Sequence, residues 1–445
     1  MTANDSVITL EYTPTLVDFA GRLSHLSGFV YLDSGDREGS AELEIVTALP
    51  SSTHRLADYS ENLGDWMTAI ETELSSYHRS GTPDSPTPIS TGCVAIGSLD
   101  YDAPAAELSR RCQIGSLTTA GIYHWVLMTH RGTRRTQVIF HPDCADSTRA
   151  EVMDAVSTPP EHTLTPFSLT TPFTASISKD QYREAIERIQ QYILAGDCYQ
   201  VNFAQRFDAA FEGDPWLAYR SARTHLAGGF SAYMHLTQGH AILSLSPERF
   251  LRIEGGVITT QPIKGTAPRH SDPNTDAALA QQLLDSEKDR AENIMITDLL
   301  RNDLGQFCEP GTVTVTELCG LHSYGNVHHL VSTVRGTLKD GTTPGQLLLA
   351  SSPGGSITGA PKKRAVEIIS ELESHTRGAY CGSVFVLAGN GWMQSSIAIR
   401  TLEISDQHLH CWGGGGITAS SQWEAEYQET LDKVGPIMEA LGNGA

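Results

Sequence analysis

The sequence predicts an α+β fold, and three observations support that prediction. Several stretches have apolar residues at helical spacing, and the clearest begins with a helix capping pattern at residue 178. Two apolar runs near the C-terminus, 383–387 and 395–404, flank an Asn390-Gly391 turn that is typical of an antiparallel hairpin. The chain has 445 residues, which suffices for two or three ordinary domains or for one large two-sheet unit. Antiparallel strands combined with long helices favour α+β over a βαβ array.

The first part of the chain is expected to be β-rich, with a few helices packed on it. Its strand-like runs are short, as at 27–32 and 137–141, and Gly or Asp interrupts them. Residues 156–177 are dense in Ser, Thr and Pro, which is typical of a surface crossing. The sequence therefore indicates an N-terminal β-rich region, 1–160, and a second region, 175–440, and we expect the two to pack as one unit.

The second region begins with a well-marked helix. Ser178 and Gln181 form a capping box, apolar residues from Tyr182 to Ile193 follow one helical face, and Gly196 ends the run. The remaining elements predicted there are a strand at 198–207, helices at 286–304, 363–372 and 424–441, and a last strand at 408–412.

Composition and charge exclude several classes of partner. Lys and Arg number 31 against 52 Asp and Glu, so the formal net charge is −21. Such a charge repels nucleic acid and anionic membrane surfaces. The sequence shows no signal peptide and no run of roughly 18 apolar residues, and its eight cysteines form no C-x-x-C pair. We expect a cytoplasmic protein with reduced thiols.

Two pairs of acids provide the first candidate chemistry. Asp289 and Glu292 lie three residues apart on one predicted helix, and Glu426 and Glu429 do the same on another, where Lys433 continues the stripe. Carboxylates on facing helices would suit Mg²⁺, which binds a few carboxylates and keeps water or substrate oxygens. The alternative, and the usual meaning of this spacing, is two solvated acidic faces.

Two glycine-rich segments are candidate anion sites. In residues 353–361, Pro361 is expected at the first position of a helix, where backbone amides and the hydroxyl of Ser356 could hold an anion. Gly413 to Gly416 follow directly after the predicted strand 408–412 as a glycine loop, which would let the backbone approach a ligand closely. Ordinary turns remain the alternative for both.

Lys264 and Glu248 form the third candidate. Lys264 lies between a strand end and a glycine turn, where partial burial would lower its pKa and make it a nucleophile or base. Glu248 lies sixteen residues earlier, and in a closed pocket its pKa would rise, so that it could act as an acid. A surface lysine and a salt-bridged glutamate are the alternative.

Eight segments in order resemble the chorismate-utilising enzymes, a family that includes the anthranilate, aminodeoxychorismate, isochorismate and salicylate synthases. The match covers roughly residues 180–435, and its segments are GDCYQVNFAQRF, SLSPERFL, PIKGTAPR, KDRAENIMITDLLRNDLG, HHLVSTVRG, PGGSITGAPKKRA, RGAYCGS and EAEYQETLDKV. The resemblance implies a large two-sheet antiparallel β sandwich flanked by helices.

The residue at position 264 implies one branch of the family. Aminodeoxychorismate synthases carry Lys in the PIKGT block, whereas the other synthases usually carry Ala. Gln200 agrees, because the isochorismate and salicylate synthases place a water-activating Lys there. The resemblance thus implies Mg-dependent amination of chorismate to 4-amino-4-deoxychorismate, towards p-aminobenzoate and folate. The alternatives are an anthranilate synthase component I and a non-catalytic, amino-acid-binding relative.

The resemblance also implies roles for individual residues. Lys264 would attack C2 of chorismate while Glu248 protonates the departing C4 hydroxyl. Glu292 and Glu429 would hold Mg²⁺, with Asp289 and Glu426 just outside or bridging through water. The implied substrate-binding residues are Tyr380, Arg400, Ser356, Gly414, Gly415, Gly416, Lys433, His329 and Thr266.

Two further ligands follow from the resemblance. The family's ammonia comes from a glutamine amidotransferase subunit, and no cysteine here lies in a glutaminase nucleophile turn, so a partner protein is implied. Residues 31–35 resemble a segment that builds an amino-acid pocket in this family, so Asp33 and Ser34 could contact a bound tryptophan.

Overall fold

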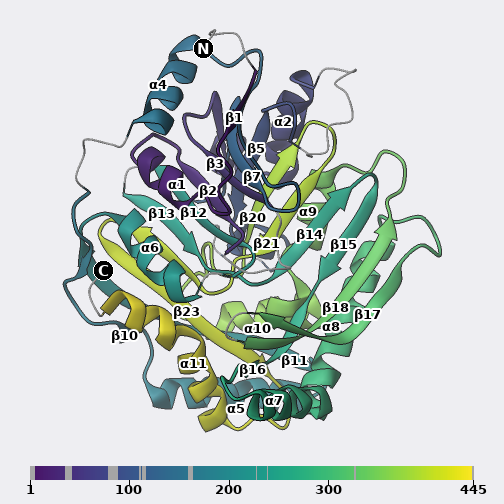
Figure 1. Ribbon diagram of the computed structural model, residues 1–445. Coiled ribbons are helices and arrows are strands. Elements are labelled where there is room, and N and C mark those ends of the chain that lie inside the picture. Colours follow the sequence, from purple (N-terminus) through teal and green to yellow (C-terminus); the bar gives the residue numbers. More distant parts are fainter. Residues whose placement is uncertain are drawn as a thin grey trace.

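Two large antiparallel sheets form the centre of the protein (Figure 1). The structure is a computed structural model that describes residues 6–35, 43–78, 89–109, 112, 117–158, 164–226, 228–237, 239–324 and 327–442. Apolar side chains of both sheets, such as Val30 and Ile45 of one and Val94 and Val386 of the other, share one hydrophobic cluster. The sheets therefore pack face to face, as the sequence predicts.

The larger sheet contains thirteen strands within the described residues. In spatial order they are β1 (Val7–Leu10), β8 (Arg135–Phe140), β7 (Trp125–His130), β3 (Leu43–Thr47), β2 (Val30–Asp33), β12 (Ser231–Thr237), β13 (His240–Ser244), β22 (Thr401–Ser405), β23 (His408–Ile417), β11 (Gln200–Glu212) and β10 (Thr174–Ala175), with β9 (Ser168–Leu169) and β19 (Gly359–Ala360) also on β11.

The smaller sheet contains ten strands within the same residues. Their order is β16 (Ile263–Pro268), β18 (Val327–Thr337), β15 (Val257–Gln261), β14 (Arg249–Glu254), β21 (Met393–Ile397), β20 (Ser383–Ala388), β5 (Val94–Leu99), β6 (Thr119–Tyr123) and β4 (Ser52–Arg55), with β17 (Thr314–Tyr324) paired to β18. Both sheets thus combine strands from the first and last parts of the chain.

Helices cover the outer faces and ends of the sheets (Figure 1). They are α1 (Val17–Leu23), α2 (Leu63–Ser76), α3 (Asp102–Leu108), α4 (Asp146–Ser157), α5 (Lys179–Leu194), α6 (Pro215–Leu226), α7 (Pro273–Asp285), α8 (Glu287–Gly305), α9 (Pro344–Ser351), α10 (Lys362–Leu372) and α11 (Trp423–Gly442), with 3-10 turns η1 (Leu56–Tyr59) and η2 (Gly355–Ile357). α11 packs on β23, and α8 packs on β16 and β18. No helix in the described ranges is both long and apolar enough to cross a membrane.

Most of the predicted elements are confirmed. The capping box of Ser178 and Gln181 is present at the start of α5, and α8, α10 and α11 begin and end within one residue of their predicted bounds. The first part of the chain is β-rich with four α-helices among its described residues. Residues 164–177 are mostly exposed, as expected of a surface crossing, while 159–163 lie outside the described residues.

Three local predictions are wrong. Residues 395–404 are not one strand, because β21 ends at Ile397 in one sheet and β22 begins at Thr401 in the other. Arg400 between them has a φ of 51°, which breaks an extended backbone. Pro361 is the N-cap of α10 and not its first helical residue. The strand predicted at 408–412 does not end there, because the glycines 413–416 are not a loop but belong to β23 and pair with β11.

Candidate active site

Lys264 projects from β16 toward the 3-10 turn η2. Its Nζ donates a hydrogen bond to the carbonyl oxygen of Ser356 at 3.1 Å. Burial lowers the pKa of Lys264, and the charges of Glu292 and Glu248 offset that effect only in part. A lysine with a lowered pKa has more of its amine in the neutral, nucleophilic form.

Glu248 lies just before β14 and meets the same serine. The hydroxyl of Ser356 donates to Glu248 Oε1 at 3.0 Å, so the two polar ends of one residue contact both the lysine and the glutamate. Burial raises the pKa of Glu248 to about 7, although the charge of Lys264 and the Ser356 hydrogen bond act in the opposite direction. This carboxyl can therefore hold or release a proton near neutral pH. The structure brings Lys264 and Glu248 together, which excludes the surface-lysine interpretation.

The predicted acids lie on α8 and α11, around Lys264. Burial raises the pKa of Glu292 against the charges of Lys264 and Lys288. For Glu429 burial acts in the same direction, but Lys433 and Lys288 outweigh it and the pKa falls. The charge of Glu429 also raises the pKa of Glu292, so the acids of the two helices lie close together. They do not form two separate solvated faces.

The other two acids make bonds of their own. Glu426 is buried and accepts a hydrogen bond from Ser421 Oγ at 2.7 Å. Asp289 accepts from Ser286 Oγ at 2.5 Å in the first turn of α8, and its side chain lies against Gly265. Of the four acids, Glu292 alone accepts no hydrogen bond from another side chain in the described residues, whereas Glu429 accepts one from Lys433.

The donor set fits Mg²⁺ and not a softer metal. Carboxylate oxygens are the ligands this ion prefers. Within the described part of the chain, no three His, Cys, Asp or Glu side chains are close enough to hold a metal by themselves. An ion between Glu292 and Glu429 would therefore take its remaining ligands from water or substrate, as Mg²⁺ does in many protein sites.

An open strand edge lies beside these acids. β22 pairs with β23 only as far as Cys411, whereas β11 pairs with it as far as Ile417, so Trp412–Ile417 has one edge without a strand partner in the described chain. Lys433 Nζ donates to Gly414 O at 3.0 Å and to Glu429 Oε1 at 2.7 Å. Backbone polar groups and one cation are thus available at this edge to receive an anionic ligand.

Two glycines of β23 let side chains approach the strand closely. A Cβ on Gly415 would lie 3.3 Å from Glu426 Oε2 and 3.5 Å from Glu429 Oε1. A Cβ on Gly416 would lie 1.9 Å from Gln200 Nε2. Gln200 is buried, and its Oε1 has no hydrogen-bond partner in the described residues. This oxygen is a free acceptor for a ligand that carries N–H groups.

The remaining predicted substrate residues lie on or next to strands of both sheets. Thr266 is two residues after Lys264 on β16, and its hydroxyl lies 2.9 Å from His329 Nδ1 on β18. Tyr380 is buried just before β20 and stacks on Trp412 of β23, with ring centroids 6.0 Å apart. Arg400 lies at the crossing between β21 and β22.

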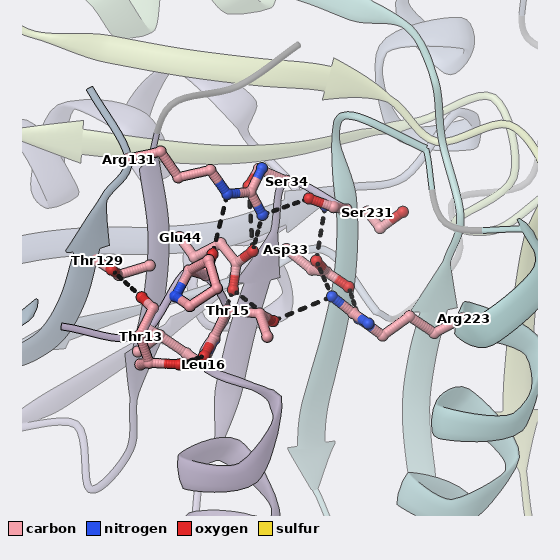
Figure 2. A network of polar contacts seen from close by, with 12 residues as sticks. Thr13, Thr15, Leu16, Asp33, Ser34, Glu44, Thr129, Arg131, Arg223 and Ser231 are labelled. Carbon is pink, nitrogen blue, oxygen red and sulfur yellow. Dashed lines mark hydrogen bonds and ion pairs between the residues drawn. The ribbon is translucent and has the colours of Figure 1, made fainter. Parts of the chain in front are cut away.

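Asp33 and Ser34 lie in a separate polar network at the end of β2 (Figure 2). Arg223 Nε donates to Asp33 Oδ2 at 2.5 Å, and Ser34 Oγ donates to Glu44, which also pairs with Arg131 at 2.6 Å. Burial, reinforced by Asp33, raises the pKa of Glu44 to about 7. A cavity of about 40 Å³ between the sheets lies beside Asp33. Both carboxylates of this network already have protein partners.

One residue near the acids was missed from the sequence. Lys288 precedes Glu292 by four residues on α8, lies 3.8 Å from Glu426 Oε1, and its charge lowers the pKa values of Glu292 and Glu429. The i, i+4 spacing alone could have identified it as a neighbour of the acids.

The chain is similar to proteins of a known family. Residues 29–439 match the family of chorismate binding enzymes. Aminodeoxychorismate synthase component 1 of Salmonella typhimurium is 40% identical over an alignment of 464 positions, which covers 99% of this chain and 99% of that protein. Anthranilate synthase component 1 of Streptomyces coelicolor is 38% identical over 287 residues, or 64% of this chain and 55% of that protein. The crystal structure of anthranilate synthase component I from Streptococcus pneumoniae superposes with a TM-score of 0.74 at 25% identity, covering 98% of this chain and 92% of that one.

Proposed function

The chain belongs to the chorismate binding enzymes, and on that premise we propose that it aminates chorismate at C4 to give 4-amino-4-deoxychorismate. The observation that supports this most directly is the Lys264–Ser356–Glu248 contact, which places a nucleophile with a lowered pKa next to an acid with a raised one. The full-length relatedness to an aminodeoxychorismate synthase component 1 points the same way.

The proposed reaction has two displacements. The neutral amine of Lys264 forms a bond to C2 as the two ring double bonds shift and the C4 hydroxyl leaves, and Glu248 supplies the proton that turns the hydroxyl into water. Ammonia then forms a bond to C4, the double bonds shift back and the bond from C2 to Lys264 breaks. The extra proton of the added ammonia returns to Glu248, so that both the amine and the acid are regenerated. The net change is the addition of ammonia and the loss of water.

Chorismate carries two carboxylates, and the site contains groups to receive them. The open edge at Gly414–Gly416 and Lys433 would receive one carboxylate, and Arg400 with Tyr380 the other. Glu292 and Glu429 would hold Mg²⁺, assisted by Asp289 and Glu426, and the bound ion would neutralise negative charge on the substrate. His329 and Thr266 would line the same pocket.

Ammonia would reach the site from a partner protein. The name component 1 of the Salmonella relative implies a second component, and we propose a glutamine amidotransferase. The Oε1 of Gln200, which has no partner in the described residues, would accept an N–H of ammonia.

A bound tryptophan would contact Asp33 and Ser34 of the N-terminal network, and a thermal-shift titration with tryptophan tests this binding. The protein would act in the cytoplasm, towards p-aminobenzoate and folate.

Product identity tests the proposed function. The protein would be incubated with chorismate, Mg²⁺ and ammonium, and the products analysed by mass spectrometry. We expect an aminated product that keeps the enolpyruvyl group, and p-aminobenzoate only after a lyase is added. Anthranilate with free pyruvate would instead identify an anthranilate synthase, and untouched chorismate would favour a non-catalytic relative.

A further inference from the structure

A buried ion pair lies beside the turn that carries Ser356. The side chains of Arg377 and Glu373 are 1% and 6% exposed. Arg377 Nε donates to Glu373 Oε2 at 2.9 Å and Nη2 donates to Oε1 at 2.6 Å. Because removing two charges from water offsets most of their attraction, such a pair stabilises a protein poorly. The bidentate contact instead fixes the orientation of the guanidinium relative to the carboxylate.

The remaining donors of Arg377 hold two backbone segments of the site. Nη1 donates to the carbonyl of Ile357 at 2.9 Å, and Nη2 donates to the carbonyl of Asn202 at 2.7 Å. Ile357 directly follows Ser356, whose carbonyl and hydroxyl contact the proposed nucleophile and acid. Asn202 lies two residues after Gln200 on β11. One planar group therefore joins the turn and the strand that carry the proposed chemistry.

The N-terminal region fixes Arg377 from its other side. The ring of Tyr101 lies 4.5 Å from the guanidinium carbon. The backbone N–H of Tyr101 donates to Gly378 O at 2.9 Å, and Gly378 N donates to Asp102 Oδ2 at 2.7 Å. The segment that carries Arg377 is thus held by residues about 275 positions earlier in the chain.

We propose that Arg377 is a positioning residue, which holds the η2 turn where Ser356 can contact both Lys264 and Glu248. The proposal rests on the proposed function, since it acts through the residues of that reaction. A lysine cannot replace it, because four directed hydrogen bonds in one plane need a guanidinium and not an ammonium.

The test compares Arg377→Lys with Arg364→Lys, whose exposed ion pair with Asp197 lies outside the site. Turnover of chorismate is divided by the concentration of folded protein, measured by gel filtration and circular dichroism, so that unfolded molecules do not count. For Arg377→Lys we expect kcat per site to fall about ten- to hundredfold, since a misplacement of 1 Å can cost that much, while KM for chorismate changes less than about threefold. The control should stay within about twofold.

Chemical rescue provides a second measurement. Millimolar guanidinium should restore part of the turnover of Arg377→Ala and leave the wild type and the control unchanged. If Arg377→Lys does not fold, Glu373→Gln is measured in its place, because it removes the charge that orients the guanidinium and is expected to lower kcat in the same way.

A kcat per site within twofold of the wild type in a folded variant would overturn the proposal, and so would an equal loss in the control. These outcomes are distinct from a failure of the proposed function, which the wild-type product decides. If the wild type makes anthranilate, the ratio of variant to wild-type turnover still tests Arg377. If the wild type leaves chorismate untouched, both proposals fall.

Discussion

Removing the hydroxyl of Ser356 should shift the pH dependence of the enzyme toward higher pH. Burial raises the pKa of Glu248 to about 7, and the hydrogen bond from Ser356 keeps it from rising further because it stabilises the carboxylate. A hydrogen bond to a charged group is worth about 1.5–3 kcal/mol, and 1.36 kcal/mol corresponds to one pH unit. In Ser356→Ala the pKa of Glu248 should therefore lie about one to two pH units above that of the wild type.

The shift is toward higher pH because Glu248 is proposed to act as an acid, and an acid must be protonated to act. With a pKa of about 7, about one tenth of the wild-type carboxyl is protonated at pH 8. In Ser356→Ala about half to nine tenths would be protonated at that pH. The alkaline limb of kcat/KM for chorismate should move up accordingly, even if the maximum rate is lower.

The assay measures kcat/KM from pH 6 to 9 with total ammonium adjusted so that free ammonia stays constant. Glu248→Gln should remove the limb together with most of the activity. Thr358→Val, which changes a buried hydroxyl of the same turn that bonds to Gly354 O, should leave the limb in place. A limb that stays or moves to lower pH in Ser356→Ala would show that Glu248 is not the acid or that Ser356 does not tune it.

Three further predictions concern the nucleophile, the metal and the N-terminal network. Lys264→Ala should lose the adduct seen by mass spectrometry and at least about a hundredfold in rate, and a normal rate would exclude the covalent step. Dialysis against EDTA should abolish turnover and Mg²⁺ should restore it, whereas full activity in EDTA would argue against a metal at the acids. Arg223→Gln would leave Asp33 buried without its ion partner, so urea unfolding should show a loss of about 3–5 kcal/mol. The exposed pair of Arg252 and Glu254 serves as the control, with an expected loss of about 0–1 kcal/mol for Arg252→Gln, and equal losses would contradict this account.

Local structure could be predicted from the sequence where short-range contacts determine it. The start of α5 depends on Ser178 and Gln181, three residues apart, and the capping pattern found it. The break in residues 395–404 depends on distant strands instead. β21 pairs with β14 and β20, and β22 pairs with β13, so the sequence near Arg400 carries no local signal for the change of sheet.

The candidate site shows the same division. Lys264 and Glu248 could be proposed from residue type and resemblance, but the bridge through Ser356 joins positions 92 and 108 residues apart and only the folded chain shows it. Asp33 was predicted to line a ligand pocket, yet its ion partner Arg223 lies 190 residues away. Long-range ion pairs of this kind are invisible to periodicity and spacing.

The mixing of early and late strands within each sheet has a consequence for synthesis of the protein in the cell. β5 has β20 as its neighbour on one edge, and the ribosome makes β20 about 280 residues after β5. At a synthesis rate of about 5–20 residues per second, this edge of β5 stays unpaired for roughly 15 to 60 s. An uncovered apolar strand edge is a site for aggregation during that time. The nascent chain should therefore depend on chaperones until its last third has been made, and a premature stop even late in the reading frame would leave the interior of both sheets open.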